Sequence, residues 1–187
     1  MNRKEKIFKF LNDLEIEEAK QLPQFCHNIN NDKKVYYGGP SFDKEELVEA
    51  IDCLLFGKWV SSGHKVHEFE IEVGKVLNQE ACVMVNSGSS ANLLMWAALT
   101  SQDKYVKNVL NIKKGDKVIT PTVCFPTTLN PILQNGFEPV FVDVDLPGLN
   151  LNLDQVEQLL ENDKNIRAIT FAHVLGNPPD MERLMYL

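Results

Sequence analysis

Asn86-Ser87-Gly88-Ser89-Ser90-Ala91-Asn92 is the stretch that decides the fold of this chain. It lies between an apolar run at residues 81–85 and a second apolar run at 93–99. This order predicts a strand, a tight turn of small residues and the start of a helix. Such a turn presents backbone N–H groups and the positive end of a helix dipole to an anion, and Gly88 lacks the Cβ that would block a close approach. The stretch alone also fits an ordinary Ser/Asn helix cap. Loops farther along the chain are therefore needed to distinguish a phosphate-binding turn from a simple cap.

The composition is that of a globular protein with a core of its own. Of the 187 residues, 44% are hydrophobic and 24% are charged. The net charge of −7, with no block of Lys and Arg, argues against nucleic acid as a partner. The first residues are rich in Lys, Glu and Asp, and no apolar run is long enough to cross a bilayer. We therefore expect a cytoplasmic protein with no signal peptide and no membrane partner.

Cysteine and histidine spacing predicts no metal site in this chain. The four cysteines, Cys26, Cys53, Cys82 and Cys124, form no CxxC pair and read as buried free thiols. His64 and His67 would share a helix face, but no third ligand lies nearby in the sequence. Solvated histidines at a helix start are the better interpretation.

The first part of the chain reads as helical. Apolar residues at helical spacing predict an amphipathic helix near the start, followed by a polar arm that runs to residue 34. Asp43 and Glu46 resemble a capping box, and the helix that they begin is predicted to end at Gly57. A loop at 58–63 then leads to a third helix, over residues 66–77.

From residue 81 onward strands and helices alternate. Continuous β-branched strands between helices predict an α/β layer with a mostly parallel sheet that is buried on both faces. Strands are expected at residues 81–85, 117–120, 139–144 and 167–172, and helices at 91–100, 129–135, from 153 and from 181.

The chain stops inside its last predicted helix. Met181, Leu184 and Leu187 have helical spacing, but no cap or polar tail follows them. We expect the N-terminal part of a longer gene product, with a helix and arm at 1–34 and an incomplete α/β domain at 35–187.

Three loops that leave strand ends carry residues typical of a ligand site. In an open α/β sheet, ligands bind at the carboxyl ends of the strands. Besides the serine-rich turn, Phe125 stands among Pro and Thr at 121–128, and His173 directly follows a strand. A phosphate cradle, an aromatic plate and an imidazole suit a flat, phosphorylated, heteroaromatic cofactor. Singly, Phe125 could be a core residue and His173 a hydrogen-bonded strand end.

The sequence resembles that of sugar aminotransferases of the DegT/StrS type, from about residue 41 to the end. The resemblance rests on VNSGSSANLL (85–94), GDKVIT (115–120) and FEPVFVDVD (137–145). Within that family, FPTTLNPILQNG (125–136) and AHVLGNP (172–178) are most similar to the CDP-4-keto-6-deoxyhexose 3-dehydrases of lipopolysaccharide biosynthesis. The N-terminal arm also fits an extension seen in that branch.

The resemblance implies a fold, a cofactor and binding residues. The fold would be the α/β large domain of a fold type I enzyme, and the cofactor pyridoxal 5'-phosphate or pyridoxamine 5'-phosphate. The cofactor-binding residues would be Gly88, Ser89 and Ser90 at the phosphate, Phe125 on the pyridine ring and His173 near the ring or substrate. A nucleotide sugar would contact Trp59, Ser62 and Gly63.

The resemblance leaves the reaction open, because the residues that decide it lie beyond Leu187 in the family's order. These are an acid at the pyridinium nitrogen and a lysine that holds the cofactor, which a histidine replaces in the dehydrases. The cysteines of a [2Fe-2S] cluster would lie there too. As a dehydrase, the full-length protein would remove the C3 hydroxyl with electrons from a reductase. As an aminotransferase, it would transfer an amino group to the C4 ketone.

Two further expectations concern the assembly and the chain itself. The resemblance implies a homodimer, and the apolar stripe of the first helix needs a cover. This chain by itself would contain no catalytic residue and would be inactive. The remaining alternative is a truncated or regulatory module that binds a phosphate ligand or only pairs with a partner.

Overall fold

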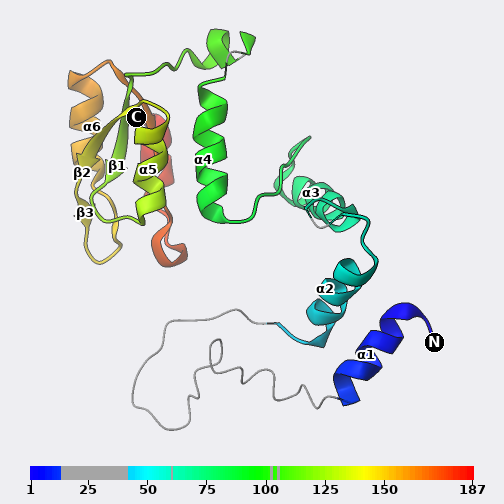
Figure 1. Ribbon diagram of the computed structural model, residues 1–187. Coiled ribbons are helices and arrows are strands. Elements are labelled where there is room, and N and C mark those ends of the chain that lie inside the picture. The colour runs from blue at the N-terminus through cyan, green and yellow to red at the C-terminus, as the bar shows by residue number, and fades with distance from the viewer. Residues whose placement is uncertain (14–41, 60, 102, 105) are drawn as a thin grey trace. The chain divides into compact units, whose positions relative to one another are not determined.

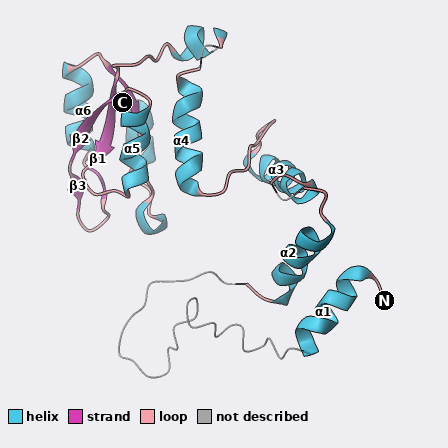
Figure 2. Cartoon of the chain, viewed as in Figure 1, coloured by secondary structure: helices cyan, strands magenta, loops and turns pink. Residues whose placement is uncertain are grey.

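The computed structural model describes residues 1–13, 42–59, 61–101, 103–104 and 106–187 (Figures 1 and 2). The chain divides into two compact units, Met1–Met84 and Val85–Leu187. The predicted polar arm, and with it the proposed boundary at residue 34, lies outside the described residues.

The first unit contains three helices: α1 (Arg3–Asp13), α2 (Lys44–Phe56) and α3 (His64–Leu77). The predicted capping box is confirmed, because the Asp43 carboxylate accepts the Glu45 amide at 2.8 Å and the Glu46 carboxylate accepts the Asp43 amide at 2.7 Å. Gly57 ends α2, as predicted, and its amide donates to the Cys53 carbonyl. His64 and His67 are exposed at the start of α3, which agrees with the sequence analysis.

Helix α1 packs on α2 through a small apolar cluster. Ile7 and Leu11 are buried against Val48. Phe8, another apolar residue of α1, stays 40% exposed. Part of the apolar stripe of α1 is therefore covered within this chain, by α2.

The second unit is built on a parallel three-stranded sheet of order β2-β1-β5, which confirms the predicted sheet type. The strands are β1 (Lys117–Pro121), β2 (Glu138–Val142) and β5 (Ile166–Ile169), and β3 (Val144–Asp145) pairs with β4 (Asn150–Leu151) in a separate antiparallel hairpin. Its helices are α4 (Gly88–Leu99), α5 (Pro126–Gln134), α6 (Leu153–Asn162) and α7 (Met181–Tyr186), with a π turn at Val106–Leu110 and a 3-10 turn at Val174–Gly176.

Helices cover both faces of this sheet, and neighbouring residues of β1 show it. Val118 packs with Trp96 of α4 and Ile132 of α5, whereas Ile119 packs with Val156 of α6. Side chains alternate between the two faces of a strand, so β1 contributes to both cores. Figure 1 shows α5 and α6 on opposite sides of the sheet.

The structure corrects several of the predicted elements. Residues 81–85 form no strand, because no strand among the described residues pairs with them. Helix α5 begins at Pro126 rather than at residue 129, since the fixed φ of proline suits the first helical position. Strand β5 ends at Ile169 rather than at residue 172.

Candidate functional site

The sheet topology brings two of the predicted loops to one edge of the sheet. Strands β1 and β5 are parallel neighbours, so their carboxyl ends lie at the same edge. After β1 the chain turns to α5 on one face, and after β5 it turns to α7, whose Leu184 packs on the other face. Ligands bind where neighbouring connections diverge in this way. Phe125 lies in the connection from β1 to α5, and His173 lies in the connection from β5 to α7.

The serine-rich turn forms the start of α4. Ser87 is the N-cap, and its hydroxyl oxygen accepts the Ser90 amide at 3.2 Å. The amides of Gly88 and Ser89 and the Ser89 hydroxyl have no acceptor among the described residues. A Cβ built on Gly88 would meet no atom within 4 Å, so this side of the turn is open. Free amides with room before them fit a phosphate group.

Ser90 has a different place in this turn. Its hydroxyl donates to Asn86 Oδ1 at 2.6 Å, while its amide is capped by Ser87. Both polar groups of Ser90 thus hold the turn in shape. Direct contact of Ser90 with a phosphate stays a prediction. The amides of Gly88 and Ser89, in contrast, have no acceptor among the described residues and are free to donate to a phosphate.

A hydrogen bond links the phosphate turn to the Phe125 loop. The Asn92 side-chain amide on α4 donates to the Thr127 carbonyl at 3.2 Å, near the start of α5. Phe125 is the residue before α5, and its side chain is 69% exposed. The structure therefore does not place Phe125 in the core of the described residues, and its ring faces are free for stacking.

Cys124, next to Phe125, is half-buried rather than buried, as are Cys53 and Cys82. Burial raises the pKa of the Cys124 thiol. The thiol therefore stays protonated at neutral pH and is a weak nucleophile.

His173 begins a strained turn after β5. Its carbonyl accepts the Gly176 amide at 2.9 Å, and its ring centroid lies 5.6 Å from that of Phe171. Within the turn, Leu175 has φ of 55° and is 96% exposed. A branched residue in the left-handed region costs about 1 kcal/mol, and such positions cluster at ligand sites. The imidazole is exposed, not buried at a strand end.

The three predicted substrate residues line one pocket in the first unit. Trp59, Ser62 and Gly63 border a cavity of about 600 Å³ at the start of α3. Trp59 is 75% exposed, which leaves its ring open for a ligand. Lys58 and Lys65 also line this pocket and give it positive charge.

Two of these contributions were missed by sequence reasoning. Asn92 belongs to the quoted stretch, but a hydrogen bond to a residue 35 positions away leaves no local signal. Lys58 and Lys65 are close to Trp59 in the sequence, and their contribution could have been predicted. Cations near an aromatic residue suit an anionic aromatic ligand. Among the described residues no group of three His, Cys, Asp or Glu side chains could hold a metal ion. None of the helices described is long and apolar enough to cross a membrane.

A family model, that of the DegT/DnrJ/EryC1/StrS aminotransferase family, matches residues 41–187. The chain belongs to this family. A 3-dehydratase relative, dTDP-4-dehydro-2,6-dideoxy-D-glucose 3-dehydratase of Saccharopolyspora spinosa, is 39% identical over 75% of this chain and 29% of its own length. Lipopolysaccharide biosynthesis protein RfbH of Salmonella typhimurium is 40% identical over 74% of this chain and 30% of its own length.

A solved structure in this family agrees with the fold. GDP-4-keto-6-deoxymannose-3-dehydratase, with a trapped PLP-glutamate geminal diamine, superposes with a TM-score of 0.71 at 32% identity. The match covers 82% of this chain and 38% of that one. The predicted large domain of a fold type I enzyme is thereby confirmed. The chain spans about a third of the length of the curated relatives it matches.

Proposed function

We propose that this DegT-family chain is the cofactor-binding part of an enzyme that uses pyridoxal or pyridoxamine phosphate to deoxygenate a nucleotide-linked 4-keto sugar at C3. The observation that carries the proposal is the shared fold with a 3-dehydratase that holds a PLP-glutamate adduct, at 32% identity over 82% of this chain. The relatives act on different nucleotide sugars, one linked to dTDP and one to GDP. The nucleotide therefore remains open, and CDP stays the expectation from the sequence.

The residues of the second unit fit the phosphorylated cofactor. The amides of Gly88 and Ser89 would donate to its phosphate, because they have no other acceptor among the described residues. Phe125 would stack on its ring, and His173 would face the ring or the substrate from the neighbouring loop. When bound, the cofactor would supply an electron sink that delocalises the negative charge developing as the C3 hydroxyl leaves.

The first unit would hold the nucleotide sugar. The Trp59 ring offers a stacking surface for the base, and Lys58 and Lys65 offer charge for the diphosphate. Ser62 and Gly63 border the same cavity and would contact the substrate through a hydroxyl and a backbone group.

Transamination is the second candidate, and the family's own description as aminotransferases favours it. Against it stands the run AHVLGNP at 172–178, which resembles the dehydrase branch. The experiment is to incubate the protein, expressed from its complete gene, with cofactor, glutamate and the CDP-, GDP- or dTDP-linked 4-keto-6-deoxy sugar. Loss of the C3 hydroxyl supports the proposal, an amino group at C4 supports transamination, and no product with any sugar refutes both.

The wider assignments are part of the same proposal. We place the N-terminal helix and arm at 1–34 and the α/β domain at 35–187, in a cytoplasmic enzyme. An electron-donating reductase is its expected partner, and a [2Fe-2S] cluster remains a prediction for residues beyond Leu187.

A homodimer is expected in solution. The support is the exposed apolar surface of the described residues, since Leu93, Leu94 and Met95 of α4 and Leu54 and Leu55 of α2 are all exposed. Light scattering on the protein from its complete gene should give twice the mass of one chain. A strictly monomeric protein would contradict this expectation.

Phe125→Leu should weaken cofactor retention about three- to tenfold, because leucine keeps apolar volume but removes stacking worth roughly 0.5–1.5 kcal/mol. Fold stability should change little, since the side chain is 69% exposed. Dialysis followed by absorbance measures retention, and thermal unfolding measures stability. Retained affinity with a large loss of stability would make Phe125 a core residue instead.

A further inference from the structure

Two residues of α1 are connected to the wall of the Trp59 pocket. Helix α1 lies before residue 41, where the match to the family model begins. It contacts α2, whose Cys53 and Phe56 line the pocket. The N-terminal helix thus touches the element that shapes the pocket, although the family match does not include it.

The first connection runs through Arg3. Its Nε donates to Asp52 Oδ1 at 2.6 Å and its second nitrogen donates to Oδ2 at 3.1 Å, while the Asp52 side chain is only 5% exposed. The same guanidinium lies 4.2 Å from the centroid of the Phe56 ring. A two-pronged ion pair and a cation–π contact fix both a side chain and its direction. Arg3 therefore holds the last turn of α2, and Phe56 with it, in one arrangement.

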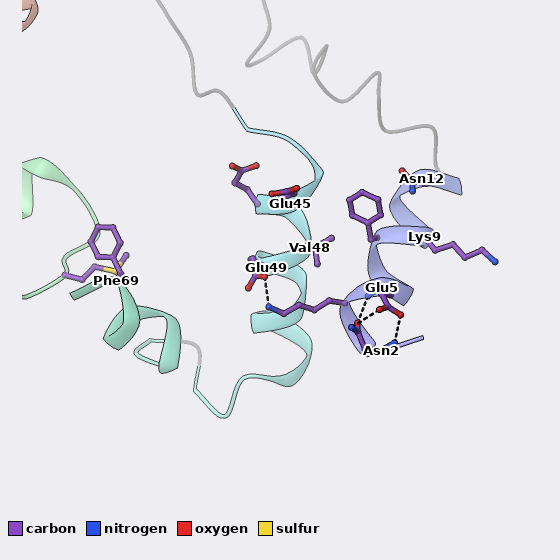
Figure 3. Close-up of a pocket in the computed structure, with 12 residues that line it drawn as sticks. Asn2, Glu5, Lys9, Asn12, Glu45, Val48, Glu49 and Phe69 are labelled. Atoms are coloured by element: carbon purple, nitrogen blue, oxygen red, sulfur yellow. Dashed lines mark hydrogen bonds and ion pairs between the residues drawn. The ribbon is translucent and has the colours of Figure 1, made fainter. Parts of the chain in front are cut away.

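The second connection is electrostatic and runs through Lys4. Lys4 Nζ lies 2.5 Å from Glu49 Oε1, and the other oxygen of Glu49 lies 3.1 Å from Lys65 Nζ. Figure 3 shows Glu49 on α2 with its dashed contact to α1. Lys65, a lining residue of the pocket, also pairs with Glu68 at 3.0 Å.

This arrangement determines how much positive charge the pocket keeps. The carboxylates of Glu68 and Glu49 accept hydrogen bonds from the Lys65 ammonium group and raise its pKa, so Lys65 stays charged. Hydrogen bonds from Lys4 and Lys65 lower the pKa of Glu49. Lys4 balances the charge of Glu49, so the group of two lysines and two glutamates around Lys65 is neutral rather than negative toward an anionic ligand.

We propose that α1 is a positioning element of the substrate pocket, in which Arg3 fixes the Phe56 wall and Lys4 frees the charge of Lys65 for the diphosphate of the nucleotide sugar. This inference rests on the proposed function, because it takes the Trp59 pocket as the nucleotide site. Arg3 and Lys4 act through Phe56, Glu49 and Lys65 and have no contact with the ligand themselves.

The test measures binding of GDP, CDP and dTDP to the protein from its complete gene by calorimetry, using the tightest of the three for the variants. Lys4→Met should bind it about three- to fivefold more weakly, the effect of an exposed ion pair. Arg3→Met also leaves the buried Asp52 carboxylate without its partner, so it should weaken binding at least as much. Lys6→Met is the matched control, an exposed lysine of α1 with no ion pair among the described residues, and it should bind normally. Lys4→Arg should restore binding, and cofactor affinity should be unchanged in all variants.

A double variant separates positioning from general damage. In a Lys65→Met background, Lys4→Met should have no further effect, because the charge that it frees is gone. Lys4→Met also decides the matter if Arg3→Met fails to fold, since exposed ion pairs contribute little to stability.

The failures are distinguishable. Two results would refute this inference together with the pocket assignment and the proposed substrate class. One is that no nucleoside diphosphate binds, and the other is that Trp59→Ala binds as well as the unaltered protein. If Trp59→Ala loses binding but the Arg3 and Lys4 variants match Lys6→Met, only the coupling to α1 is overturned.

Discussion

Gly88→Val is expected to weaken binding of pyridoxal phosphate by about a hundredfold or more. The amides of Gly88 and Ser89 are the donors that the fold leaves free, and a valine side chain would occupy the open space before them. Hydrogen bonds to a charged group contribute about 1.5–3 kcal/mol each, so losing two of them is a loss of at least two powers of ten. Titration of the apoprotein with pyridoxal phosphate, followed by absorbance, measures the change.

The fold should survive this substitution. A Cβ at Gly88 meets no atom within 4 Å, and the residue is not in the left-handed region that favours glycine. Ala98→Val is the matched control, because it places the same side chain at an exposed position of the same helix, away from its N-terminus. If Gly88→Val binds the cofactor as well as Ala98→Val does, the phosphate turn is assigned wrongly.

Local signals in the sequence were sufficient for most of the elements. Asp43 with Glu46 and Asn152 with Gln155 begin their helices as predicted, because a cap depends on residues three apart. The parallel sheet followed from strands that are apolar throughout, since only a sheet covered on both faces requires them.

The errors arose where the structure depends on distant residues. The run at 81–85 has the composition of a strand, but a strand forms only beside a partner, and no described strand lies there. The stripe of α1 was expected to need a cover, and Val48, far along the sequence, covers its residues Ile7 and Leu11. Neither partner can be read from local periodicity.

The candidate site shows the same division. The turn at 87–90 was readable because its chemistry is contiguous, and its free amides are where the sequence predicted them. The role of Ser90 within the turn depends on Asn86 Oδ1, and the bridge from Asn92 to Thr127 crosses 35 positions. Side-chain geometry of this kind appears only when the loops are folded together.

The second prediction concerns Met1–Leu187 expressed alone, which is expected to form no product from a nucleotide-linked 4-keto sugar. The loops at the carboxyl ends of β1, β2 and β5, residues 122–125, 143 and 170–180, contain no lysine that could hold the cofactor. The resemblance to the family places that lysine, or the histidine in its place, beyond Leu187, together with the acid at the pyridinium nitrogen. Phosphate contacts by themselves bind a cofactor but move no proton.

The measurement is product analysis after incubation with cofactor, glutamate and the sugar nucleotide. GDP-4-keto-6-deoxy-D-mannose 3-dehydratase of Escherichia coli, a relative that is 35% identical over 73% of this chain, serves as the active control in the same assay. The chain should also aggregate, because Leu93, Leu94 and Met95 of α4 are exposed. Light scattering on the same sample detects that.

Aggregation and inactivity have to be separated, because an aggregated sample would fail the assay for a trivial reason. The soluble fraction should still bind pyridoxal phosphate weakly through Gly88 and Ser89, and Gly88→Val should abolish that binding. Binding without turnover is the expected result, since Gly88 and Ser89 have amides with no acceptor among the described residues and the resemblance places the proton-moving residues beyond Leu187. Turnover by the soluble fraction would mean that residues within Met1–Leu187, such as His173 or Asp143 at the carboxyl edge, supply the acid and the base. The catalytic centre would then lie inside this chain, and its placement beyond Leu187 would be wrong.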